Sequence, residues 1–221
     1  MLSLANPNLK AEKMKSWDLG VTQSFFDEKL SFDMSYFNSN YDDYIGYRGE
    51  TDPMTWMYVG QYVNVDKAKI QGVEGKITWE PKNWFKIVSS YTYTKSQDEV
   101  TGADLPGVPR NSIKTTAYWT PHKRVDIYAG VEANSGRYMS ATKNSDKTDG
   151  YVDARVGANI KLVKTENYEM SLRGTVYNLL NQDISMYKSG PISYYAPGIN
   201  YRIGIFATYT LPEKKKKIEN L

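Results

Sequence analysis

The chain has 221 residues, a formal net charge of +3, a single histidine and no cysteine. Without thiols it cannot form disulfides or thiolate metal sites, and one histidine, His122, leaves almost no histidine-based catalysis open. The small net charge also lacks the basic face of a nucleic-acid-binding protein, so no nucleic-acid partner is expected.

The hydropathy of the chain excludes a membrane-spanning helix but not a membrane β-barrel. No run of about 18 apolar residues occurs, which a spanning helix would need. The mean hydropathy is −0.60, yet a barrel strand alternates apolar and polar residues and so hides its apolar face from an average. Residues 1–10 lack the pattern of a secretory signal peptide. We therefore expect either a cytoplasmic protein or a piece of a longer one.

Alternating apolar and polar residues recur along the whole chain, while helical spacing is scarce. Alternation with a period of two predicts strands that have two different faces. In chain order, the predicted strands are 17–25, 30–36, 62–81, 85–93, 113–119, 125–133, 152–162, 168–176 and 201–211.

The third predicted strand is unusually long, and its alternation changes phase near Gly72. Val73, Ile77 and Trp79 share one face of this strand. We expect the part from Val73 onward to cross a bilayer and the part before Gly72 to rise above it. The change of phase predicts a β-bulge at Gly72 and Val73, near the membrane edge.

The connections between these strands alternate in length. Short connections are predicted at 27–29, 81–84, 121–124 and 163–167, and long ones at about 40–57, 97–110, 139–149 and 179–200. An up-and-down membrane barrel sorts its loops in this way, with tight periplasmic turns and long outer loops. The lengths of the strands also suit a tilted crossing of the hydrocarbon layer.

The residues on the two faces of the predicted strands indicate a barrel wall. One face carries aliphatic and aromatic residues, with Trp17, Trp79, Trp84 and Trp119 near strand ends, where rings sit at the headgroup level. The other face carries too many charges for a packed core and must meet water or a polar plug. A soluble sheet with one wet face is the alternative, but it needs a covering layer that the sequence does not offer.

Five segments, in order, resemble the C-terminal barrel of the TonB-dependent outer-membrane receptors. They are NPNLKAEKMKSWDLG (6–20), YVNVDKAKIQGVEG (62–75), LPGVPRNS (105–112), GTVYNLLNQD (174–183) and APGINYRIGIFATYTL (196–211). The departures are Ala11 for proline, Asn111 for histidine, Leu180 for phenylalanine and Leu211 in place of the closing aromatic residue.

The resemblance implies an all-β fold: about nine antiparallel strands of an up-and-down transmembrane barrel, out of the 22 of this family, without the plug domain. The domains expected are a lead-in or outer-loop segment at 1–15, barrel at 16–211 and a polar basic tail at 212–221. The tail, with Lys214–Lys217, is interpreted as a solvated segment, with attraction to anionic headgroups as the alternative.

No catalytic pattern occurs, so the chain is not expected to be an enzyme, and no metal or cofactor is predicted. Asp42 with Asp43 and Asp98 with Glu99 could bind calcium through oxygens. They lack the spacing of a calcium loop, and solvated carboxylates are the favoured interpretation.

Ligand contact is predicted for aromatic and arginine residues in the long loops, because loops carry function on rigid scaffolds and these residues anchor ligands well. An outer aromatic girdle is the alternative interpretation for Tyr44 and Tyr138. The candidates are Tyr44, Tyr47, Arg48, Trp56, Arg137, Tyr138, Tyr187, Tyr194 and Tyr195.

The family resemblance implies a receptor segment in the outer membrane of a Gram-negative-type bacterium, for uptake of a ferric siderophore, haem, cobalamin or a similar scarce ligand. Its implied partners are membrane lipid, the remainder of the barrel, the plug and, through the missing N-terminal part, the TonB complex. A passive channel or structural barrel formed by oligomerisation is the alternative.

Overall fold

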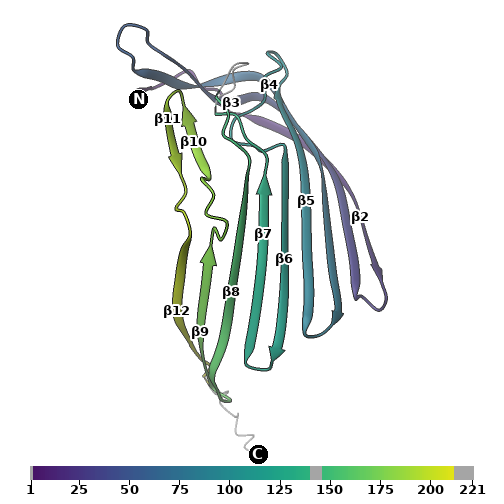
Figure 1. Cartoon of the computed structure of the whole chain (residues 1–221). Coiled ribbons are helices and arrows are strands. Elements are labelled where there is room, and N and C mark those ends of the chain that lie inside the picture. The colour runs from purple at the N-terminus through teal and green to yellow at the C-terminus, as the bar shows by residue number, and fades with distance from the viewer. Residues whose placement is uncertain (1, 140–145, 212–221) are drawn as a thin grey trace, which may run out of the picture.

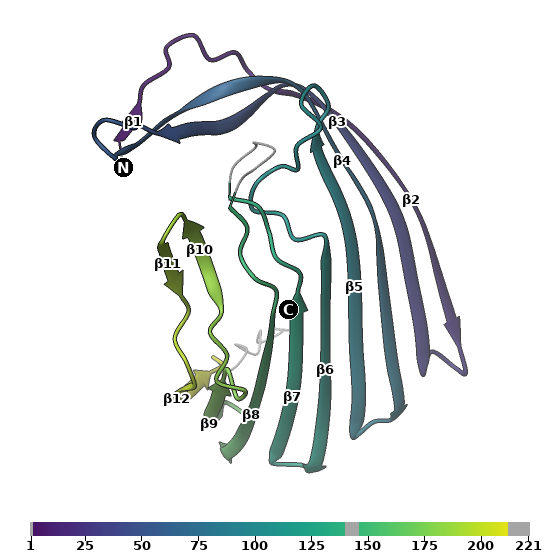
Figure 2. The ribbon, with the colours of Figure 1, turned by 45° about the horizontal axis from the view of Figure 1, so that its top comes forward.

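The computed structural model describes residues 2–139 and 146–211, which form a curved, open sheet (Figures 1 and 2). Nine strands follow one another in the order β12-β9-β8-β7-β6-β5-β4-β3-β2, and all neighbouring pairs along this path are antiparallel. They are β2 (Lys13–Phe25), β3 (Leu30–Thr51), β4 (Tyr58–Lys82), β5 (Phe85–Asp98), β6 (Asn111–His122), β7 (Val125–Asn134), β8 (Tyr151–Lys164), β9 (Tyr168–Tyr177) and β12 (Asn200–Tyr209).

These nine strands confirm the predicted wall strands. Within the described residues there is no helix long and apolar enough to cross a membrane. The closing basic tail, 212–221, lies outside the described residues, and so does part of the predicted loop 139–149.

The register of the strand pairs confirms that the sheet has one apolar and one polar face. Leu19 pairs with Tyr36, Tyr36 with Val73 and Val73 with Tyr93, so apolar residues of four strands form one row. On the other face, polar and charged residues pair in the same way, as Lys114 does with Glu132. Because the side-chain period of a strand is two, each face is continuous across the sheet.

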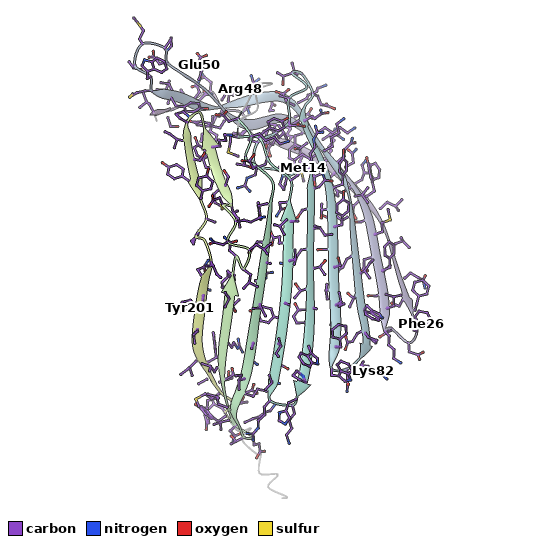
Figure 3. All side chains as sticks on the ribbon, in the orientation of Figure 1. Met14, Phe26, Arg48, Glu50, Lys82 and Tyr201 are labelled. Carbon is purple, nitrogen blue, oxygen red and sulfur yellow. The ribbon has the colours of Figure 1, made fainter. Side chains whose placement is uncertain are left out.

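The apolar face lies on the outer, convex side of the sheet. On interior strands its side chains are spread apart, with Val131 at 46% and Ile113 at 43% exposure, while Thr116 and Ser171 on the polar face have 8% and 4%. Curvature separates side chains on the convex side and crowds those on the concave side. Figure 3 shows Tyr201 pointing away from the edge strand β12 on the convex side.

Aromatic rings cluster at both ends of the apolar face. Near the short turns, the Phe85 ring lies 6.1 Å from both the Trp79 and Trp84 rings, and Phe85 pairs with Trp119. Toward the other end, the rings of Trp17 and Tyr36 are 5.3 Å apart. Two aromatic bands flanking an apolar band are typical of a membrane barrel.

The prediction of a bulge at Gly72 and Val73 is wrong. Gly72 pairs with Phe37 on one side and Thr94 on the other, and neither ladder is interrupted there. A Cβ on Gly72 would lie 2.7 Å from Cζ of Phe37 and 2.0 Å from the carbonyl oxygen of Tyr93. The glycine is therefore needed for close packing in a regular ladder.

The irregularities lie at the short turns instead. Register shifts occur between Trp79 and Lys82 and between Trp119 and His122, where the chain contains a proline that cannot donate to the ladder.

The predicted loop 40–57 is also wrong, because β3 continues to Thr51 and only a short turn, 52–57, joins it to β4. Asp52 closes this turn by accepting hydrogen bonds from the backbone N–H groups of Met54 and Thr55. Above the membrane neither face of a strand has to be apolar, so residues 41–51 lack the alternation that marked the wall.

Three short strands were not predicted. β10 (Ser185–Ser189) and β11 (Ile192–Tyr195) form a hairpin inside the predicted loop 179–200, and β1 (Leu2–Leu4) pairs in parallel with β4. Each is too short for a hydrophobic period to stand out.

Candidate functional site

The upper halves of β3 and β4 form a two-stranded extension, here called the ribbon (residues 44–65). β2 pairs with β3 only up to Asp42, and β5 pairs with β4 only up to Ala68. Asp43 has a positive φ of 56° at the base of the ribbon. In Figure 3 Arg48 and Glu50 mark the ribbon, at the end of the molecule opposite to Lys82 and Phe26 in the short turns.

A buried ion pair holds the ribbon to the end of β5. Nη2 of Arg48 lies 2.9 Å from Oδ2 of Asp98, whose side chain is fully buried. Oδ1 of Asp98 accepts hydrogen bonds from the backbone N–H groups of Val100 and Thr101. Burial raises the pKa of the Asp98 carboxyl, but these hydrogen bonds and the Arg48 charge outweigh burial and leave the pKa below its ordinary value of 3.8.

This contact corrects one prediction and qualifies another. Asp98 is not a solvated carboxylate, because it neutralises a guanidinium and caps the following turn. Arg48 is a predicted ligand contact. One nitrogen of its guanidinium pairs with Asp98, and its side chain is 41% exposed.

The lead-in segment contacts both strands of the ribbon. Nδ2 of Asn64 donates to the carbonyl oxygens of Lys10 and Asp43, and its Oδ1 accepts from the N–H of Lys10. Farther along, Glu12 accepts from the N–H of Ile45. An isolated two-stranded hairpin is marginally stable in water, so these contacts and the pairing with β1 determine where the ribbon lies.

Tyrosine rings cluster on the ribbon and beside the β10–β11 hairpin. The Tyr47 ring lies 6.4 Å from Tyr58 in a stacked arrangement and 5.2 Å from Tyr62 edge-on. On the hairpin, the rings of Tyr187 and Tyr194 are 5.9 Å apart. We call these five residues the phenol cluster.

Electrostatics link the two halves of the phenol cluster. Burial raises the pKa of the Tyr58 phenol, and the neighbouring phenols of Tyr47 and Tyr187 raise it further. In Figures 1 and 2 the hairpin lies beneath the ribbon. The hydroxyl of Tyr47 is buried and has no hydrogen-bond partner within the described part of the chain.

The loop between β7 and β8 holds the hairpin in place. Nη2 of Arg137 donates to the carbonyl oxygen of Met186 over 3.0 Å, and the N–H of Gly190 donates to Asp146. The neighbouring Tyr138 ring lies under the ammonium group of Lys147, 5.2 Å from it. A ribbon, a loop and a hairpin that are distant in sequence thus form one outer surface.

Of the nine predicted ligand-contact residues, Tyr47 and Arg48 lie on the ribbon, Tyr187 and Tyr194 contact each other on the hairpin, and Arg137 supports the hairpin. The others are separate. Tyr44 packs on Tyr41 at the base of the ribbon, where burial and the charge of Glu12 raise its pKa. Trp56 lies at the tip of the turn with 83% exposure, and Tyr195 ends β11 with 57%.

Sequence reasoning missed Tyr58 and Asn64, and it gave Asp98 a different role. Tyr58 begins β4 beside a predicted loop, and Asn64 is the asparagine of YVNVDKA, which we read only as a family motif. The partner of Asp98 is 50 residues away in the chain, and no periodicity reveals such a pair. Among the described residues, no group of three or more acidic or histidine side chains could hold a metal ion.

Comparisons with known proteins agree with this fold. Residues 2–179 match the family described as TonB dependent receptor-like, beta-barrel. An iron-regulated outer membrane virulence protein of Vibrio cholerae is 23% identical over 214 residues, which are 90% of this chain and 31% of that protein. The vitamin B12 transporter BtuB of Photobacterium profundum is 27% identical over 198 residues, 86% of this chain and 30% of that protein.

The fold has close counterparts among solved structures. The ferric enterobactin receptor PfeA of Pseudomonas aeruginosa superposes with a TM-score of 0.71 at 21% identity, over 93% of this chain and 32% of the receptor. At that identity the likeness concerns the fold alone. The chain spans about a third or less of the relatives it matches.

These relatives are receptors and transporters, not enzymes, and the wall described above lies in the outer membrane of a Gram-negative bacterium, as the family resemblance implied. The chain belongs to the TonB-dependent receptor-like β-barrel family.

Proposed function

We propose that this chain forms the C-terminal wall and outer loops of a receptor that takes up a scarce, large ligand, such as a ferric siderophore, haem or cobalamin. Its family membership and the names of its relatives support this class of ligand. In the intact receptor the remainder of the barrel, a plug and the TonB complex would complete the transport cycle.

One observation carries the proposed ligand contact: tyrosine rings gather on a ribbon and on a hairpin that lie far apart in the sequence but at the same outer end of the sheet. Stacked phenols offer flat apolar surface together with hydrogen-bond donors, which suits large ligands that carry rings and polar oxygens. The cluster lies at the outer end of the wall, where a ligand would arrive.

The direction of the edge strands favours a receptor wall over a barrel made of copies of this chain. All neighbouring pairs from β2 to β12 are antiparallel, so the first and the ninth strand of the wall run in the same direction. Joining β12 of one copy to β2 of another would require a parallel pair. A partner wall with an odd number of strands closes the barrel with antiparallel pairs only.

Binding is tested on the purified chain in detergent micelles by quenching of its intrinsic fluorescence. Ferric enterobactin, haemin and vitamin B12 are titrated separately. We expect one of them to bind, and Tyr47→Ala with Tyr187→Ala to weaken its Kd by about thirtyfold or more, because aromatic anchors contribute about 2 kcal/mol or more.

Tyr209→Ala, at the opposite end of the wall, is the matched control and should leave the Kd unchanged. Equal weakening by the control, or failure of all three ligands to bind, would refute the proposed contact surface.

A further inference from the structure

Three lysines gather on the convex face of the sheet, just above the outer aromatic band. Lys95 on β5 pairs with Gln71 on β4, and this row follows directly on the apolar row described above. One row farther out, Lys15 on β2 and Lys69 on β4 both pair with Asn40 on β3. Residues two apart along a strand share a face, so these side chains continue the apolar face outward. We call Lys15, Lys69 and Lys95 the lysine cluster.

The lysine cluster lies at the height expected for lipid headgroups. A tilted strand crosses the hydrocarbon layer with about nine to eleven residues. Counted along β4 from Trp79, in the aromatic band near the short turns, such a span ends between Gln71 and Lys69. In Figure 3, Met14 marks this height on β2, beside the neighbouring Lys15. The three ammonium groups therefore lie at the polar border of the outer leaflet.

The lysine cluster has no acidic counter-charge. None of its ammonium groups forms an ion pair in the described part of the chain. The acid of the next row outward, Asp42, lies between Lys13 and Lys67 and so does not neutralise the cluster. The other residues in the two rows of the cluster are all uncharged: Trp17, Asn38, Asn40, Gln71 and Gln97.

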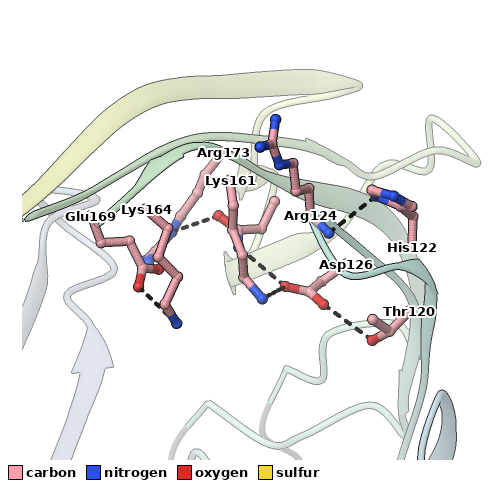
Figure 4. A network of polar contacts seen from close by, with 9 residues as sticks. Thr120, His122, Arg124, Asp126, Lys161, Lys164, Glu169 and Arg173 are labelled. Atoms are coloured by element: carbon pink, nitrogen blue, oxygen red, sulfur yellow. Dashed lines mark hydrogen bonds and ion pairs between the residues drawn. The ribbon is translucent and has the colours of Figure 1, made fainter. Parts of the chain in front are cut away.

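Elsewhere on the sheet cations are paired or absent. Near the short turns, Nζ of Lys161 lies 3.3 Å from Oδ2 of Asp126, and Nζ of Lys164 lies 3.6 Å from Oε2 of Glu169 (Figure 4). At the outer end of the convex face, the other wall strands finish in uncharged residues: Asn111, Ala133, Val152, Val176 and Tyr201. Unpaired positive charge is thus confined to one part of the outer border.

A ladder of hydrogen-bonded amides lies between the lysines. Nδ2 of Asn38, a residue only 6% exposed, donates to Oε1 of Gln71 over 3.2 Å, and Nδ2 of Asn40 donates to Oδ1 of Asn38 over 3.1 Å. The hydroxyl of Tyr36 also donates to Oε1 of Gln71. These bonds fix the Gln71 amide, and its Nε2 has no acceptor among the described residues. Nε2 of Gln71 is therefore a donor available to an anion held by the lysines.

We propose that the lysine cluster binds the phosphate group of an anionic lipid in the outer leaflet. Lysine ammonium groups bind phosphate as point charges. A phosphate monoester carries about −1.5 to −2 charges at pH 7, which three lysines compensate. Neighbouring strands are about 4.8 Å apart, so Lys15 and Lys69 are about 10 Å apart at their Cα atoms, within the joint reach of two extended side chains.

The apolar rows directly below the lysine cluster favour a lipid over a free phosphate ion. They offer the acyl chains of the same molecule a surface, which a free ion would not use. The proposal depends only on the position of the wall in the outer membrane and goes beyond ligand uptake.

The test uses the purified chain, labelled with a fluorophore at its N-terminus, in detergent micelles at low salt. Diphosphoryl lipid A is titrated, and its Kd is measured by thermophoresis. We expect the Kd to rise as salt is added, and the same lipid without its phosphates to bind at least about tenfold more weakly. The combined variant Lys15→Gln, Lys69→Gln, Lys95→Gln should weaken the Kd for diphosphoryl lipid A by about tenfold or more.

The matched control removes three lysines at the opposite end of the wall, in the short turns: Lys29→Gln, Lys82→Gln and Lys123→Gln. It should change the Kd by less than about twofold. Equal weakening by both variants would show unspecific attraction and overturn the proposal. Equally tight binding of the lipid without phosphates would show contact with acyl chains alone and overturn it too. So would complete displacement of the lipid by an equal concentration of inorganic phosphate, which would indicate a site for free anions.

Lys69→Gln alone, the central lysine of the cluster, serves if the combined variant fails to fold by circular dichroism. It should weaken lipid binding by about threefold, and an unchanged Kd would count against the proposal. Lipid binding is measured whether or not a ligand binds at the phenol cluster, so the two proposals fail or hold independently.

Discussion

At the scale of single residues, one glycine of β4 is required by close packing, whereas another lies beside open space. Gly72 and Gly75 occupy the same strand, but a Cβ on Gly72 would meet the Tyr93 carbonyl oxygen at 2.0 Å, whereas a Cβ on Gly75 would meet nothing within 4 Å. Sequence alone treats the two glycines alike, and it misled us into placing a bulge at the first one.

We predict that Gly72→Ala lowers the free energy of unfolding by about 1–3 kcal/mol, because the added methyl group forces the Phe37 ring and the Tyr93 backbone apart. The measurement is urea unfolding of the chain in detergent micelles. Gly75→Ala is the control and should be neutral or slightly stabilising. Equal destabilisation by the two variants would contradict the packing argument.

At the scale of elements, the ribbon is held by side-chain contacts and by β1, because the wall strands β2 and β5 end below it. The wall strands were predictable because lipid on one side and water on the other impose a strict alternation on their residues. The ribbon is free of that constraint, so its strands, its attachment at Asn64 and its ion pair with Asp98 became visible only in three dimensions.

We predict that Asp98→Asn increases hydrogen exchange of the ribbon amides in β3 and β4 by about tenfold, since it leaves the Arg48 guanidinium without a counter-charge. The pKa of Asp98 lies below 3.8, so the ion pair stabilises the ribbon above that pH. Its contribution disappears as the pH falls through the lowered pKa.

The protection factors of the wild-type ribbon amides should therefore fall only below about pH 3.8 and approach those of Asp98→Asn. Amides of β7, far from the ion pair, provide the internal control. A wild-type ribbon that exchanges as fast as the variant at pH 7 would show that the ion pair does not hold it.

At the scale of the whole molecule, the open sheet presents two free edges, β2 and β12, within the described residues. The apolar convex face and the aromatic bands match an outer-membrane wall, and the concave face matches a polar lumen.

We predict that cells producing only this chain show no TonB-dependent uptake of ferric enterobactin, haemin or vitamin B12 in a radiolabel assay. The chain should also give neither a heat-modifiable band on unboiled gels nor steady conductance in planar bilayers, because β2 and β12 cannot pair in an antiparallel way. Energy-dependent uptake would overturn the first expectation, and conductance would favour a channel made of several copies.

The sequence by itself determined the wall: nine strands, their two faces, the short turns and the membrane environment. Lipid on one face and water on the other require apolar and polar residues to alternate along every crossing strand. Only the tertiary structure decided how the ribbon, the hairpin and the lead-in meet and which acids pair with arginines. These features depend on pairs of residues far apart in the chain, such as Arg48 with Asp98, and no local pattern encodes such contacts.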